Sequence, residues 1–70
     1  MHSSKIFESI KKRRQSLGIT QEHLAELSGI GLRTLKTLET GNSNPTLDTL
    51  TKLAEVLGME LKLEVKQPKL

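Results

Sequence analysis

Four side chains in the short stretch from Leu32 to Thr37 have the chemistry needed to contact a DNA duplex. Arg33 can donate two hydrogen bonds to the edge of a guanine, which makes it the strongest candidate for reading a base. Leu32 is apolar and either covers a thymine methyl group or packs against a neighbouring side chain. Thr37 suits a base or a phosphate, and Lys36 suits a phosphate. The alternative for Arg33 and Lys36 is an ordinary solvated charge.

Such side chains need a rigid element to present them, and Thr20–Gly41 predicts two short helices joined by a tight turn. Thr20 can cap the first helix with its hydroxyl, and Gly29 can adopt the left-handed conformation that ends it. Gly31 is a tolerable cap for the second helix, and Gly41 closes that helix. The apolar residues expected to pack the two helices together are Leu24, Ala25, Leu27, Ile30, Leu35 and Leu38. This is a helix-turn-helix layout, whose second helix can enter a DNA major groove with the four candidate side chains outward.

The same stretch resembles the lambda-repressor/Cro family of helix-turn-helix domains, also called the XRE family. The residues that carry the resemblance are Thr20, Gln21, Leu24, Ala25, Ser28, Gly29, Leu35, Leu38, Glu39 and Gly41. Further matches at fixed spacing extend it over Phe7–Gly58. The resemblance implies a mainly α fold: a compact, lambda-repressor-like DNA-binding domain of four to five helices in residues 1–58.

Several further roles follow from this resemblance. Gln21 resembles the family's phosphate-clamping glutamine, and its place at a helix N-terminus suits an anion. Backbone or side-chain donors to phosphate are also expected at Gly31, Asn42 and Ser43. By resemblance, Arg14 and Glu39 form an internal ion pair that ties two helices together. A glutamate among core leucines needs such a partner if it is buried.

The flanking segments also follow a helical pattern. The spacing of Ile6, Ile10 and Leu17 predicts a first helix over 5–17, which also carries the basic run Lys11–Arg14. Residues 41–45 are a loop by composition, after which Thr46 caps a last helix that Gly58 ends. The apolar stripe of that helix, which we expect in the core, is Leu47, Leu50, Leu53, Ala54 and Leu57.

After Gly58 the hydrophobic period changes from 3.6 to 2. The apolar residues Met59, Leu61, Leu63 and Val65 alternate with Glu60, Lys62, Glu64 and Lys66. This predicts a half-buried β-strand over 59–66, whereas the commonest family pattern ends in a fifth helix, and residues 67–70 form a short tail. No second strand is evident in the sequence, so we expect this one to pair across a homodimer, with its apolar face also lying on helices. Met59, Leu61, Leu63 and Val65 are therefore the expected dimerisation residues.

Composition excludes several classes of function. The 70 residues suffice for one small domain, and they contain no cysteine and a single aromatic residue. His2 and His23 are far apart and no carboxylates cluster with them, so we expect no metal site, no cofactor and no catalytic group. The sequence has neither an apolar run of about 18 residues nor a signal-peptide core, which predicts a cytoplasmic protein without a membrane partner. The net charge of +3 permits nucleic-acid binding without requiring it.

These observations predict a homodimeric, sequence-specific repressor that binds double-stranded DNA at a palindromic operator. A compact repressor domain followed by a strand is similar to the antitoxin subunits of HipA-type toxin–antitoxin pairs. Those antitoxins repress their own operon and bind a kinase-like toxin. The alternative is a stand-alone or phage-type regulator without a toxin partner. The operator sequence, any small-molecule effector and the choice between repression and activation remain open at this stage.

Overall fold

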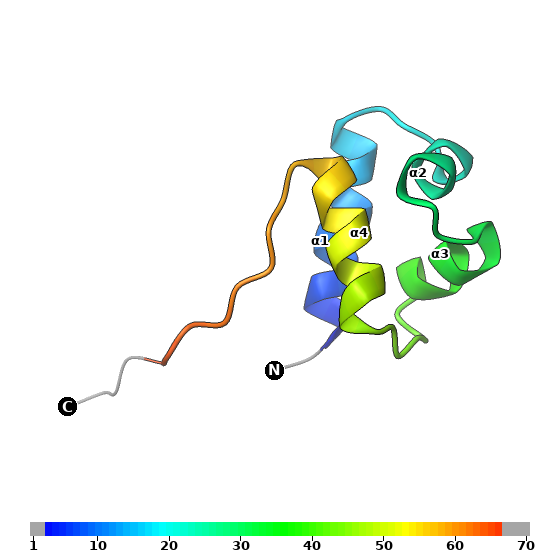
Figure 1. Ribbon diagram of the computed structural model, residues 1–70. Coiled ribbons are helices and arrows are strands. Elements are labelled where there is room, and N and C mark those ends of the chain that lie inside the picture. Colours follow the sequence, from blue (N-terminus) through cyan, green and yellow to red (C-terminus); the bar gives the residue numbers. More distant parts are fainter. Residues whose placement is uncertain (1–2, 67–70) are drawn as a thin grey trace.

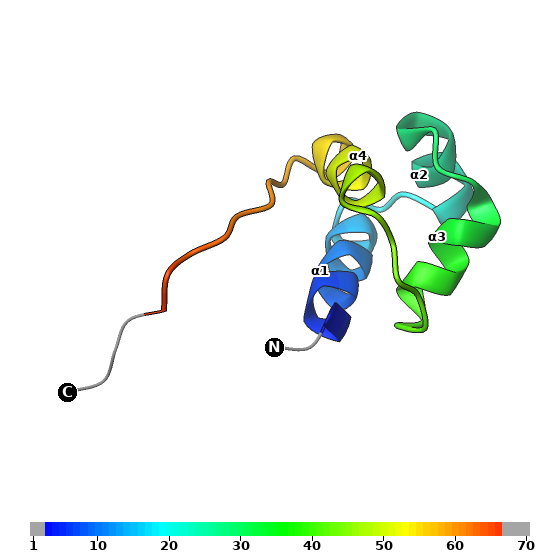
Figure 2. The ribbon, with the colours of Figure 1, turned by 60° about the horizontal axis from the view of Figure 1, so that its bottom comes forward.

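The computed structural model describes residues 3–66, which form four helices in this part of the chain (Figure 1). The helices are α1 (Ser3–Ser16), α2 (Gln21–Ser28), α3 (Leu32–Glu39) and α4 (Leu47–Leu57). The second and third form the helix-turn-helix pair, and α1 and α4 pack against each other and against that pair (Figure 2). The expected mainly α fold of four to five helices is confirmed, with four helices in residues 3–66.

Local capping explains three helix boundaries, the start and the end of α2 and the start of α4. The hydroxyl of Thr20 accepts a hydrogen bond of 3.0 Å from the His23 N–H at the start of α2. The hydroxyl of Thr46 accepts one of 3.1 Å from Thr49 N–H at the start of α4. Gly29 ends α2 with a φ of +75°, a left-handed conformation that a Cβ atom would disfavour. These residues therefore set the boundaries through their own backbone conformation or through hydrogen bonds to residues three or four positions away.

The core draws side chains from all four helices, which explains how so short a chain forms one packed body. Its buried apolar residues are Phe7, Ile10, Leu24, Ala25, Leu35, Leu38, Leu53, Ala54 and Leu57. Most of them recur at helical spacing, so each helix turns one face inward. The single aromatic residue, Phe7, is part of this core and is only 2% exposed.

Two leucines expected to be packed, Leu27 and Leu47, are exposed instead, as is Leu17 from the helical pattern of residues 5–17. Leu17 lies beyond the end of α1, and Leu47 is the first residue of α4, so each sits where its helix leaves the packed body. Leu27 lies on the outer flank of α2, whose inward face buries Leu24 and Ala25. A short helix that meets its neighbours along one face cannot bury every apolar residue near that face.

The expected strand over 59–66 is not present, and the described residues contain no β-strand. This segment, which we call the C-terminal arm, leaves α4 and runs away from the helices without coiling (Figure 1). Met59 is half-buried, whereas Leu63 and Val65 are 101% and 95% exposed, so the expectation that their apolar face lies on helices is wrong for the single chain. A strand requires a partner for its backbone N–H and C=O groups, and residues 3–66 supply none. The predicted tail at 67–70 lies outside the described residues.

Candidate nucleic-acid interface

One face of α3 is buried and the opposite face is open to solvent. Leu35, Leu38 and Glu39 are buried on the inner face. Arg33 and Thr37 lie one turn apart on the outer face, and both are exposed, as is Lys36. The packing of the inner face therefore holds these candidate side chains at fixed positions on a rigid helix.

Two residues of α3 modify the expected picture of this surface. Leu32 is half-buried and packs against the core, although part of its side chain remains exposed. Thr34 is exposed as well, beside Gly31, but it was not among the expected candidates. The helical spacing of Arg33 and Thr37 already implied that Thr34 borders the same outward surface.

Glu39 joins three helices through a network of charged hydrogen bonds. Arg14 of α1 donates from Nε to Glu39 Oε2 at 2.8 Å and from Nη2 to Oε1 at 3.0 Å, a two-point contact. A third donor of Arg14, Nη1, reaches the Ile19 carbonyl at 2.8 Å. Gln21, the first residue of α2, donates from Nε2 to Glu39 Oε1 at 2.9 Å. The end of α3 is thereby fixed to α1 and to the start of α2.

This network also determines the charge of Glu39, whose side chain is only 3% exposed. Burial alone would raise the pKa of Glu39, because it disfavours the charged carboxylate. Hydrogen bonds from Arg14 and Gln21 outweigh that effect and hold the pKa below its ordinary value. The hydrogen bond between Arg14 and Glu39 also raises the pKa of Arg14, so both members of this pair are ionised at neutral pH.

The other predicted phosphate contacts lie at the ends of α2 and α3. Gln21 is half-buried and commits one amide N–H to Glu39, which orients the rest of its amide group. Gly31 is the exposed N-cap residue of α3. In the loop that follows α3, Asn42 is exposed and Ser43 is half-buried. The candidate residues therefore come from three short segments: the start of α2, the start of α3 and the loop that follows α3.

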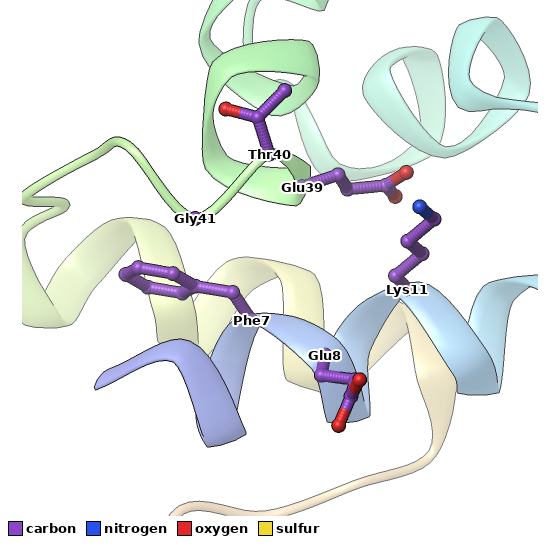
Figure 3. Close-up of a pocket in the computed structure, with 6 residues that line it drawn as sticks. All are labelled: Phe7, Glu8, Lys11, Glu39, Thr40 and Gly41. Atoms are coloured by element: carbon purple, nitrogen blue, oxygen red, sulfur yellow. The ribbon is translucent and has the colours of Figure 1, made fainter. Parts of the chain in front are cut away.

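The basic run of α1 has roles that its sequence did not reveal. Arg13 donates from Nε to the Leu57 carbonyl at 2.9 Å and so caps the last turn of α4. Lys11 directs its amino group towards the Glu39 carboxylate, whereas Glu8 points away (Figure 3). Because the two positions joined by Arg13 are 44 residues apart, no local signal could have indicated this contact.

A cavity of about 190 Å³ between α1 and the end of α3 is lined by Phe7, Glu8, Lys11, Glu39, Thr40 and Gly41 (Figure 3). Within residues 3–66 no group of three or more histidine, cysteine or acidic side chains is placed to hold a metal ion. In the same part of the chain, no helix has the length and apolar character needed to cross a membrane.

Comparison with known proteins identifies the family. A family model described as helix-turn-helix matches residues 10–63, which is most of the chain. The chain belongs to this family. The resemblance to lambda-repressor/Cro (XRE) domains is therefore confirmed, and the family consists of DNA-binding regulators rather than enzymes.

Relatives of known sequence span bacteria and archaea. The chain is 44% identical over 50 residues to an uncharacterized HTH-type transcriptional regulator of Haemophilus influenzae, covering 71% of this chain and 51% of that protein. It is 41% identical over 51 residues to another such regulator, of Methanothermobacter thermautotrophicus, covering 73% and 74%. It is 33% identical over 57 residues to the cryptic phage CTXphi transcriptional repressor RstR of Vibrio cholerae, covering 81% and 51%. The chain thus spans about half to three quarters of the length of these relatives.

Proposed function

We propose that this helix-turn-helix protein is a sequence-specific transcriptional repressor that inserts α3 into the major groove of double-stranded DNA. The observation that carries the proposal is the exposed polar outer face of α3, held in place by a buried inner face. The N-terminal part of a recognition helix is the part that reaches base edges, and Arg33 is its second residue. Relatives named as transcriptional regulators and as a phage repressor support the same function.

Each candidate residue has a distinct role in this proposal. Arg33 reads a base, with Thr37 one turn further along the helix, and the exposed part of Leu32 meets a thymine methyl group. Lys36 neutralises a phosphate. The groups that position the helix on the DNA backbone are Gln21, Gly31, Asn42 and Ser43. The hydrogen bond from Gln21 to Glu39 supports the assignment of Gln21 to the DNA backbone, because it orients the Gln21 amide group from inside the protein.

The protein acts as a homodimer in the cytoplasm and binds a palindromic operator. A helix of eight residues is about 12 Å long and contacts only a few base pairs. Two copies related by a dyad would present their α3 helices to inverted half-sites about 34 Å apart, which multiplies the specific contacts. The apolar residues Leu63 and Val65 of the C-terminal arm support this dimer, since they are 101% and 95% exposed in the single chain, and Leu61 beside them is 39% exposed.

The test is binding of operator variants at one fixed salt concentration. An operator selected from random duplexes is titrated by fluorescence anisotropy, together with its single-base variants. Arg33→Ala should weaken binding by about 1–3 kcal/mol and lose discrimination at one base position. The matched control is Lys52→Ala, which removes one exposed positive charge from α4, outside the candidate residues. Equal loss by Arg33→Ala on every variant would show a phosphate contact and refute its assignment to a base.

A finer proposal is that this repressor is the antitoxin of a HipA-type toxin–antitoxin pair. It is supported by the sequence pattern, because a compact domain followed directly by a segment with the alternation of a strand is similar to those antitoxins. The alternative is a stand-alone or phage-type regulator, which the similarity to the phage repressor RstR favours. Co-expression with the product of an adjacent gene for a kinase-like protein decides between them. A stable complex that abolishes toxicity supports the antitoxin, and the absence of such a gene or complex leaves the stand-alone regulator.

A further inference from the structure

We infer that two copies of this chain pair through an antiparallel ribbon of residues 60–66 whose two-fold axis passes through Leu63, so that Lys62 of each copy faces Glu64 of the other. This inference rests on the proposed homodimer and specifies its interface. It follows from three features of the C-terminal arm: its alternation, its charge order, and the way it leaves the helical body.

The alternation of the arm restricts which residues can lie opposite one another. In an antiparallel pair, directly opposed residues project from the same face of the ribbon. The odd-numbered residues of the arm are apolar and the even-numbered residues 60–66 are charged. A register that opposed odd to even residues would therefore place charges among the leucines. The axis must consequently pass through a residue, not between two residues.

The order of charges then selects one residue for the axis. With the axis at Leu63, Glu60 faces Lys66 of the partner subunit and Lys62 faces Glu64 of the partner subunit. Symmetry repeats both contacts, so every charged residue of 60–66 meets an opposite charge. Opposite charges directly across a ribbon are favourable, and like charges are unfavourable. This register therefore satisfies the complete charge pattern.

The neighbouring registers fail this criterion. An axis at Lys62 or Glu64 opposes like charges throughout, and a parallel ribbon in register does the same. An axis at Leu61 places Glu60 opposite Lys62 of the partner subunit, but it places Glu64 opposite Gly58 of the partner subunit and so leaves Glu64 without an opposite charge. An axis at Val65 brings Pro68 into the ladder, where it has no N–H to donate.

The body of the protein fixes the start of the arm and provides an apolar surface beside it. The Met59 N–H donates to the Ala54 carbonyl at 2.8 Å, and Arg13 holds the Leu57 carbonyl at 2.9 Å. The arm therefore leaves α4 in a defined direction. A groove of about 440 Å³ beside it is lined by Ile6, Leu47, Leu50, Leu61, Lys62 and Leu63.

The partner's arm is the occupant that fits this groove. In the inferred register Leu61 faces Val65 of the partner subunit, so a second aliphatic side chain arrives where Leu61 already lines the groove. The fully exposed Leu63 meets its own symmetry mate on the axis. The apolar side of the ribbon thereby gains cover from both copies, while the charged side stays in water.

Charge reversal in the full-length chain tests the register. Lys62→Glu and Glu64→Lys should each weaken the dimer about tenfold or more at low salt, because each creates two like-charge contacts. An equimolar mixture of the two variants should dimerise as tightly as the wild type, since every contact then joins opposite charges. The double variant Lys62→Glu/Glu64→Lys has the wild-type composition and net charge and should also dimerise normally. Sedimentation equilibrium measures these four samples and the wild type, and circular dichroism verifies that each is folded.

Matched controls separate local pairing from net charge. Lys52→Glu and Glu26→Lys change the net charge by the same amounts at exposed positions on α4 and α2, and should leave the dimer intact. The inferred register is wrong if the wild type dimerises but mixing the single variants does not restore the dimer. If the wild type is monomeric at tens of micromolar, the proposed homodimer itself is refuted. Operator binding by the wild type, measured separately, tests the DNA-binding function independently of either result.

Discussion

Replacing Arg14 by methionine should remove most of the stability of this small domain. Domains have about 0.05–0.15 kcal/mol of stability per residue, which gives roughly 4–10 kcal/mol for a chain of this length. Methionine would leave the Glu39 carboxylate, 3% exposed, without its charged partner. Breaking one side of a buried ion pair costs about 3–5 kcal/mol. Arg14→Met should therefore leave the domain marginally folded or unfolded.

Replacing Glu39, the other partner of the ion pair, should cost less stability, because the two partners differ in their access to water. Arg14 is 11% exposed and its long side chain can turn towards solvent when Glu39→Leu removes the carboxylate. We expect a loss of about 1–3 kcal/mol for this variant. In the double variant Arg14→Met/Glu39→Leu no buried charge remains, and such apolar replacements are often close to neutral. The coupling between the two positions, which is the sum of the two single losses minus the loss in the double variant, should therefore be about 4 kcal/mol or more.

Urea denaturation at neutral pH measures these differences. The chain has no tryptophan or tyrosine, so far-UV circular dichroism is the suitable signal. A urea slope of about 1 kcal/mol/M converts the expected loss for Arg14→Met into a midpoint lower by about 3 M or more. All variants must be compared at one protein concentration, because a dimer is stabilised by mass action. Strictly additive losses in the double variant would show that the ion pair does not stabilise the fold by pairing, and would refute this reasoning.

Three other outcomes are expected. The pKa of Glu39 is lower in the folded state, so the unfolded chain binds the proton more readily. The free energy of unfolding should therefore fall as the pH drops below about 4.5, the ordinary pKa of a glutamate. In acid denaturation, Glu39→Gln should lose that part of the pH dependence. Gln21→Ala should weaken binding nearly equally across operator variants, unlike Arg33→Ala, because phosphates carry no base identity; a loss confined to one variant would contradict this. Deleting residues 59–70 should give a folded monomer with weak operator binding, detectable by sedimentation and anisotropy, and a truncated chain that still dimerises would assign the interface elsewhere.

The arm illustrates a prediction that was half right. Alternation predicted an extended, non-helical segment after Gly58, and the structure contains no helix in residues 59–66. The same pattern predicted a strand half-buried on the helices, and Leu63 is instead fully exposed. Side-chain periodicity is a property of the segment alone, whereas a β-ladder depends on a second backbone. A single copy of the sequence does not contain that second backbone.

The sequence by itself determined the helices and the face that each turns inward. Thr20 and Thr46 accept from N–H groups three residues ahead, and Gly29 and Gly58 turn left-handed at helix ends. These effects involve neighbours within one helical turn, and therefore appear directly in the order of residues.

Only the tertiary structure decided which polar groups of different helices meet. Gln21 donates to Glu39, 18 positions away, and Arg13 donates to Leu57, 44 positions away. It also decided that Leu27, at acceptable helical spacing, faces water. Such contacts depend on how the helices pack against one another, and residue types with their local spacing do not specify that packing.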